Sequence, residues 1–351
     1  MAQELEGTKA TPEVTLTPGA GRPSVMPRLR IRREYGLLSA LVFVMGLYSV
    51  LAPGFLTPFN LINVLRQVSI VEIAAVGGTM VILLGGIDLS TGSIVNLSGC
   101  AAAMFLLGNG GVYNGLGYGQ SYPLWAAIVA IMLAIAVGAG VGFTNGLIIT
   151  KGRIPPFIAT LATMTAFQGL AELLTNANPV LIQVGPYTDV ALGEFLDIPY
   201  AIYIMVLITI AGWVMLTKTK IGRQVYAFGG NPVAATLSGV RGNRVQLLVY
   251  VLAGALAGVS GIIVSALVTS GQPVGAVGFN LDVIAAVVVG GTSLMGGRGT
   301  LMGTVLGAMF IAVLGNGLTL LNVQTYWQEI LRGLVIAGAV GLDGFVARRS
   351  R

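Results

Sequence analysis

The stretch PLWAAIVAIMLAIAVGAGVGFTNGLIIT, residues 123–150, carries no charged side chain. A helix needs about 20 apolar residues to cross the hydrocarbon core of a bilayer, so this stretch is long enough to span a membrane. A second uncharged run, 246–278, is also long enough. Strands of a membrane barrel would alternate polar and apolar residues with period two, and these runs do not. They predict an all-α, polytopic membrane protein.

The composition of the whole chain agrees and excludes several kinds of site. Of the 351 residues, 55% are hydrophobic and only 9% are charged, whereas an ordinary soluble domain has about 25% charged residues. The absence of histidine excludes imidazole triads, HExxH zinc sites and histidine metal cages. No lysine stands in a phosphate-loop pattern, and Cys100 has no second cysteine for a disulfide. We therefore expect no cofactor or metal on this chain.

Apolar segments divide the chain into a membrane domain, 35–347, and two tails. Residues 1–34 are polar and end in a basic cluster, which predicts a disordered cytoplasmic tail, and 348–351 form a second basic tail. The expected segments are about 35–52, 67–84, 91–107, 124–149, 155–174, 201–217, 246–269, 281–295, 301–321 and 328–346. They predict about ten transmembrane helices, although 67–107 and 281–303 could each contain a broken helix.

The loop charges give an independent test of this topology, because lysine and arginine collect on the cytoplasmic side. With alternating spans, the loop 218–245 holds five basic residues, whereas the outer loop 176–200 holds Asp189, Glu194 and Asp197; the other outer loop is 108–123. Arg66 and Arg332 are the exceptions, each near the outer start of a span. The pattern predicts that both termini are cytoplasmic.

Asp88 lies in GGIDLSTGS, residues 85–93. Gly85 and Gly86 can break a helix, and Asp88 is then placed to cap a new helix that starts near Ser90. The alternative is that Asp88 lines a transport path near a gate, because charged groups at membrane depth usually face a cavity or a partner.

Other polar and small residues at membrane depth also have two interpretations. Hydroxyls and amides could line a path for a neutral solute, or they could bond neighbouring helices. The path candidates are Asp88, Ser90, Asn96, Ser98, Thr163, Thr165, Gln168, Asn316 and Thr319. Glycines at spacings of three or four, such as Gly138 and Gly142, indicate close helix packing. Glu329 and Arg332 have the spacing of an ion pair on one helix face.

Two segments echo each other along the chain. Residues 73–92 and 284–303 share I-A-A-V and a glycine pair twelve residues after the isoleucine. Transporters often contain internal repeats. Chance similarity is the alternative, because glycine and alanine are common in all membrane helices.

A short helix is predicted within GRQVYAFGGNPVAATLSGV, residues 222–240. Asn231 suits the N-cap, Pro232 the first helical position and Gly239 the left-handed end. Val233, Leu237 and Val240 form one apolar stripe. Two turns of helix scarcely hold together alone in water, so something should receive the stripe. Lipid headgroups and a protein partner both remain open.

Four segments together resemble the permease subunit of ribose-type sugar ABC importers. They are GGIDLSTGSIVNLSG (85–99), KGRIPPFIATLATM (151–164), the stretch 222–240, and LDVIAAVVVGGTSLMGGRGTLMGTVLGA (281–308). The resemblance extends from about 60 to 345. It implies a non-catalytic permease of the bacterial inner membrane that pairs with a second copy of itself. The implied partners are a cytoplasmic ATPase on separate chains, which binds ATP and Mg, and a periplasmic sugar-binding protein. No nucleic-acid partner is implied.

The resemblance also implies roles for two loops. The cytoplasmic loop would carry the helix that couples to the ATPase, and 176–200 would receive the binding protein. The implied coupling positions are Gly222, Gly229, Gly230, Asn231, Ala234, Ala235, Leu237, Ser238 and Gly239. The expected cargo is a neutral pentose, hexose or polyol. The main alternative is a secondary transporter driven by an ion gradient through Glu72, Asp88 and Glu172; an intramembrane enzyme is disfavoured by the absence of histidine.

Overall fold

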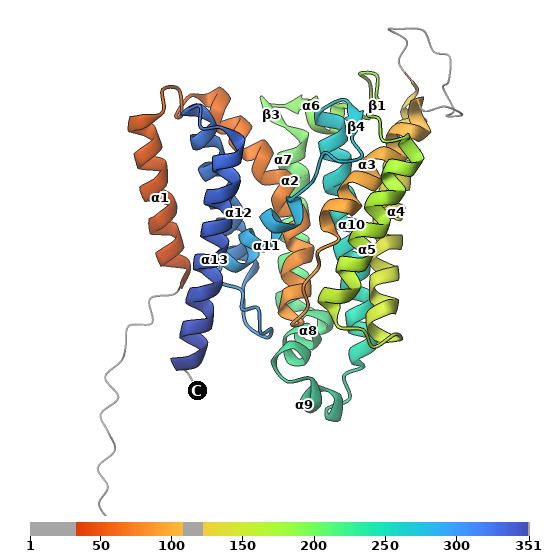
Figure 1. Ribbon diagram of the computed structural model, residues 1–351, viewed down its shortest axis with the longest axis vertical. Coiled ribbons are helices and arrows are strands. Elements are labelled where there is room, and N and C mark those ends of the chain that lie inside the picture. The colour runs from red at the N-terminus through yellow and green to blue at the C-terminus, as the bar shows by residue number, and fades with distance from the viewer. Residues whose placement is uncertain (1–32, 108–121, 350–351) are drawn as a thin grey trace, which may run out of the picture.

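A computed structural model describes residues 33–107 and 122–349 (Figure 1). Most of the predicted tail 1–34 and of the outer loop 108–123 lies outside these residues, as do residues 350 and 351. The first helix already begins at Arg33, so the tail prediction was too long by two residues. The last helix continues to Arg349, and the cytoplasmic basic tail 348–351 stays a prediction.

Each of the ten expected segments contains a helix. The helices and strands are α1 (Arg33–Leu51), α2 (Pro58–Leu83), α3 (Thr91–Leu107), α4 (Leu124–Thr150), α5 (Pro156–Thr175), β1 (Val180–Leu181), α6 (Asp189–Leu192), β2 (Glu194–Phe195), β3 (Ile198–Pro199), α7 (Tyr200–Lys218), α8 (Lys220–Gly230), α9 (Pro232–Leu237), α10 (Gly242–Leu267), β4 (Ser270–Gly271), α11 (Phe279–Val289), α12 (Leu301–Leu320) and α13 (Thr325–Arg349). Six of the described helices are long and apolar enough to cross a membrane, namely α2, α4, α5, α7, α10 and α12. The number of crossings and the side of each terminus stay predictions.

Helix α2 begins well before the apolar segment from which it was predicted. The side chain of Thr57 caps it by accepting a hydrogen bond from the amide of Asn60, and Pro58 occupies the first turn. Both residues favour a helix start. Asn60 and Arg66 interrupt the hydrophobic pattern of these first turns, which is why the sequence prediction began at 67.

Both suspected breaks are present. Helix α2 ends at Leu83, and Gly85, with φ of 79°, leads into an extended segment before α3. Figure 1 shows this segment rising from the lower end of α2 to α3. The second break is the stretch 290–300, which separates α11 from α12 and is called the 290–300 loop below. At 1.5 Å per residue, α11 rises only about 16 Å, well short of the roughly 30 Å hydrocarbon core.

The sequence echo has a structural counterpart at one point. Gly85 and Gly296 are corresponding positions, and both have left-handed φ angles of 79° and 81°. They also touch, because a Cβ atom on Gly296 would lie 2.9 Å from the amide nitrogen of Gly85. The two helices end at different points of the echo, at Leu83 and Val289, so the likeness is local.

Close packing at glycine organises the centre of the bundle. Helix α10 runs along α4 and also contacts α2 and α3 (Figure 1). A Cβ atom on Gly138 would overlap the carbonyl oxygen of Gly254, and one on Gly142 would overlap that of Tyr250. The packing role predicted for these glycines is confirmed, since the two backbones approach where side chains would separate them.

Candidate coupling site and polar clusters

Helix α8 is an element that the sequence prediction did not separate from its neighbours. The Thr219 side chain caps it by accepting a hydrogen bond from the amide of Gly222. Gly222, Val225 and Gly229 are buried, whereas Arg223 is exposed. This amphipathic pattern places one face of α8 against the protein, at the end of the bundle where α9 also lies (Figure 1).

The buried face of α8 is seated on the end of α2 and on the 290–300 loop. A Cβ atom on Gly229 would overlap the carbonyl oxygen of Leu83 and lie 2.9 Å from the amide nitrogen of Gly297. Gly297 donates a backbone hydrogen bond to the same Leu83 oxygen at 2.8 Å. The Tyr226 hydroxyl donates to the carbonyl oxygen of Gly299 at 2.9 Å. Helix α8 is therefore in direct contact with the end of α2 and with the 290–300 loop.

The caps predicted for the short helix α9 are confirmed. The Asn231 Oδ1 atom accepts hydrogen bonds from the amides of Val233 and Ala234 at 3.1 and 3.0 Å. Pro232 is the first helical residue, and Gly239 has a left-handed φ of 88°. Local sequence alone fixes both ends of this helix.

The predicted apolar stripe of α9 is divided. Val233 and Leu237 are 70% and 85% exposed, but Val240 is half-buried and packs against the body. The reason is that the left-handed Gly239 turns the chain back before Val240. Val233 and Leu237 border a groove of about 870 Å³, which Arg241 also lines. This α9 groove combines exposed apolar surface with positive charge and can receive another protein.

The nine implied coupling positions separate into two groups. Gly222, Gly229 and Ala235 are buried, so in the described part of the chain they hold α8 and α9 in place. The exposed positions are Gly230, Asn231, Ala234, Leu237, Ser238 and Gly239. Only this second group offers surface to a partner, and its role in coupling stays a prediction.

One polar cluster joins the extended segment before α3 to α4 and α5. The Asp88 Oδ1 atom accepts hydrogen bonds from the Ser90 amide at 2.8 Å and from the Ser90 hydroxyl at 2.6 Å. Asn145 donates to the Ser90 hydroxyl oxygen at 2.8 Å and accepts from Thr163 at 2.5 Å. Asp88 therefore holds Ser90, the residue that directly precedes α3, which agrees with a local structural role at this helix start. Asn145 was missed, and its only signal was one amide within an uncharged helix.

A second cluster ties α3 and α5 to the segment that descends to α11. Asn96 donates to Gln168 at 3.0 Å and accepts from the amide of Ala276 at 2.8 Å. Gln168 donates in turn to the carbonyl oxygen of Pro273 at 2.7 Å. Because these groups pair with one another, the cluster holds α3, α5 and the segment before α11 in contact.

Of the remaining path candidates, Ser98 and Asn316 are buried, whereas Thr165 and Thr319 are exposed. Asn316 of α12 exchanges two hydrogen bonds with Asn60 of α2, at 3.0 and 2.9 Å. The Ser98 hydroxyl has no hydrogen-bond partner among the described residues. Thr165 and Thr319 each donate to a backbone carbonyl of their own helix. Asn316 and Thr319 also bond side chains of other helices. The exposure of these four residues to a solute in another conformation stays a prediction.

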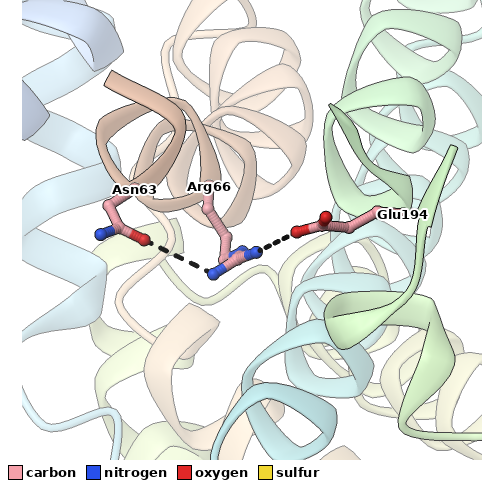
Figure 2. A network of polar contacts seen from close by, with 3 residues as sticks. All are labelled: Asn63, Arg66 and Glu194. Carbon is pink, nitrogen blue, oxygen red and sulfur yellow. Dashed lines mark hydrogen bonds and ion pairs between the residues drawn. The ribbon is translucent and has the colours of Figure 1, made fainter. Parts of the chain in front are cut away.

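Both exceptions to the loop-charge pattern are ion-paired. Arg66 lies 3.4 Å from Glu194 and 3.5 Å from the Asn63 side-chain oxygen, as Figure 2 shows. Arg332 contacts Asp282 of α11 at 3.0 Å. The expected partner of Arg332 was Glu329, and that prediction was wrong because Arg332 faces α11. Each arginine thus has an acidic partner, at the end of the bundle that the loop charges predict to be the outer one.

Comparisons with known proteins support the resemblance inferred from the motifs. Residues 60–340 match the family described as branched-chain amino acid transport system / permease component. The chain is 42% identical over 314 residues to the ribose import permease protein RbsC of Escherichia coli (strain K12), covering 88% of this chain and 93% of that one. It is 43% identical over 318 residues to RbsC of Bacillus subtilis (strain 168), covering 89% and 93%.

A more distant relative extends the match over the whole chain. The L-arabinose ABC transporter permease protein AraH of Azospirillum brasilense is 31% identical over 350 residues, which cover 100% of this chain and 98% of that one. No solved structure matches. The chain therefore belongs to this family of ABC importer permease components, which are multi-pass proteins of the inner membrane and translocate their cargo across it.

Proposed function

We propose that this chain is the permease subunit of an ATP-driven importer for a neutral monosaccharide, a pentose, hexose or polyol. The observation that carries the proposal is the exposed pair Val233 and Leu237 on a helix seated, through α8, on the ends of membrane segments. Such a helix needs a receiver, and a cytoplasmic ATPase subunit supplies both the receiver and the energy.

A sugar is favoured over an amino acid as cargo, although the family description names branched-chain amino acids. Relatives that match nearly the whole chain include permeases named for ribose, allose and arabinose. The polar groups of the two clusters are mostly amides and hydroxyls, which suit a neutral solute rather than a zwitterion. We therefore assign a monosaccharide.

The proposed roles of the permease and the ATPase subunits follow from a motif that this sequence lacks. It has no phosphate-loop motif, so ATP and Mg would bind the partner ATPase and this chain would contribute no catalytic residue. Closure of the ATPase pair would push α9, and α8 would pass the displacement to the carbonyl end of α2 and to the 290–300 loop. These are the points at which the membrane segments are already broken, so they can reorient as rigid pieces.

Two further partners complete the proposed importer. The outer loop 176–200 exposes Leu181, Val184 and Leu196, at 69%, 69% and 76%, and these would contact a loaded sugar-binding protein. A second copy of this chain would cover part of the apolar outer faces of the bundle. The path candidates would then line a passage when the helices separate.

Reconstitution tests the proposal against the secondary-transporter alternative. Proteoliposomes containing this chain, its partner ATPase and the sugar-binding protein should accumulate labelled ribose or a related sugar only when ATP is supplied. Accumulation by this chain alone on a proton or sodium gradient would refute the importer.

A variant pair tests the role of α9. Leu237→Glu places a charge on the exposed apolar surface and should abolish ATP-driven uptake while leaving the protein in the membrane, because an unpaired charge is costly to bury in an interface. Leu237→Met keeps an apolar side chain of similar volume and should retain uptake. Equal uptake by both variants would remove α9 from the coupling contact.

A further inference from the structure

A small apolar groove lies between α7 and α12, away from the α9 groove. It has a volume of about 150 Å³ and is lined by Thr209, Ile210, Trp213, Leu301, Met302 and Val305. Its lining residues lie within the last turns of α7 and the first turns of α12. The groove is therefore near the end of the bundle that carries α8 and α9 (Figure 1).

The shape of the groove follows from a close approach at its base. A Cβ atom on Gly212 would lie 2.6 Å from a methyl group of Val76 and 3.2 Å from one of Leu301, so α7 packs deeply there. Trp213 and Met302 stand outward, at 44% and 59% exposed. Two large apolar side chains thus project on either side of a recess that opens outward.

The surface inside the groove is suited to hydrocarbon. Thr209 supplies the only hydroxyl among the lining residues, and it donates to Glu72 in the protein interior at 3.4 Å. Its polar atom is thus directed inward, and the rest of the lining is apolar apart from the Trp213 ring nitrogen. A polar solute would lose hydrogen bonds with water on entering, whereas an acyl chain would not.

Positive charge lies beside the groove, where α7 ends. The Lys218 ammonium group lies 5.7 Å from the centroid of the Trp213 ring, within the range of a cation–π contact. Lys218, Lys220 and Arg223 are all exposed. Basic residues beside a gap between membrane helices, on the cytoplasmic side, are suited to anionic lipid headgroups.

We propose that this groove binds an anionic phospholipid of the inner leaflet. One acyl chain lies against Trp213 and Met302, and the phosphate and headgroup contact Lys218. The charge complementarity at Lys218 selects anionic over zwitterionic lipid, while the groove itself accepts the chain of either. Bound lipid would thus contact both α7 and α12, next to the start of α8.

Quenching of Trp213 fluorescence by brominated lipid tests the site. The variant Trp125→Phe/Trp327→Phe leaves Trp213 as the only tryptophan, and it is reconstituted with phosphatidylglycerol or phosphatidylcholine brominated at the same acyl position. Half-maximal quenching should need about fivefold less phosphatidylglycerol, the preference that one basic residue near an anionic surface provides. Lys218→Gln in the same background should abolish that preference.

A matched control uses the tryptophan at the other end of the bundle. In Trp213→Phe/Trp327→Phe the remaining Trp125 should be quenched equally by the two lipids. The proposal is overturned if Trp213 is not quenched by either lipid, as expected if a second copy covers the groove. It is also overturned if both lipids quench Trp213 equally. Native mass spectrometry of the wild type should retain phosphatidylglycerol, and Lys218→Gln should lose it, so the test does not depend on the tryptophan variants.

Discussion

Replacing Gly229 with alanine tests whether α8 is held on the body of the protein by a backbone contact. The added methyl group would overlap the carbonyl oxygen of Leu83 and lie 2.9 Å from the amide nitrogen of Gly297. Both are backbone atoms, so neither can rotate away as a side chain would, and α8 must lift. Overpacking of this kind costs about 1–3 kcal/mol, which changes a local equilibrium about 5- to 150-fold.

Hydrogen exchange in lipid nanodiscs measures this change directly. The Gly297 amide donates to Leu83 in the native contact, so its exchange reports how often the contact opens. We expect peptides covering the 290–300 loop to exchange about 5- to 150-fold faster in Gly229→Ala, as that cost implies.

The neighbouring glycine provides the control. Gly230 is exposed, and a Cβ atom there would meet no described atom within 4 Å. Gly230→Ala should exchange like the wild type, since alanine also favours the helix. Equal exchange in the two variants would refute the seating of α8. Loss of uptake in Gly229→Ala without faster exchange would instead make Gly229 a partner contact.

Three further changes test contacts described above. Gly142→Ala should separate α4 from α10 and lower the stability by about 1–3 kcal/mol in thermal unfolding, whereas Gly140→Ala, with no atom within 4 Å, should not. Asn60→Leu or Asn316→Leu alone leaves a buried amide unpaired and should cost about 1–3 kcal/mol, and the double variant should cost less than the sum; additive losses would contradict the pairing. Glu194→Gln should cost less than about 1 kcal/mol, because that carboxylate is 47% exposed; a larger loss of thermal stability would show a stronger ion pair.

The sequence predicted those parts of the fold that depend on apolar length and local caps. Helices α3 and α5 begin and end within one or two residues of the expected segments, and the caps of α9 follow from Asn231 and Gly239. The start of α2 was missed, because polar residues in its first turns pack against α12 and the outer loop. That packing is tertiary, and hydropathy along one segment does not reveal it.

The candidate site was predictable as a set of residues but not as a surface. The motif resemblance placed Gly229 and Gly230 together, although one is buried and the other exposed. The difference depends on Leu83, which is distant in sequence and lies beneath only one of them. Similarly, the spacing of Glu329 and Arg332 predicted a pair on one helix, whereas the structure pairs Arg332 with Asp282 across two helices.

The shortness of α11 has a consequence for how the protein is made. A helix of 11 residues rises about 16 Å, so a nascent chain that ends there cannot place α11 across the bilayer as an independent span. Its backbone ends would face hydrocarbon without partners, which lipid does not tolerate. Helix α11 packs against α2, which is synthesised before it, and against α12, which is synthesised after it. We therefore expect the packing of α11 to be complete only once α12 has also been inserted.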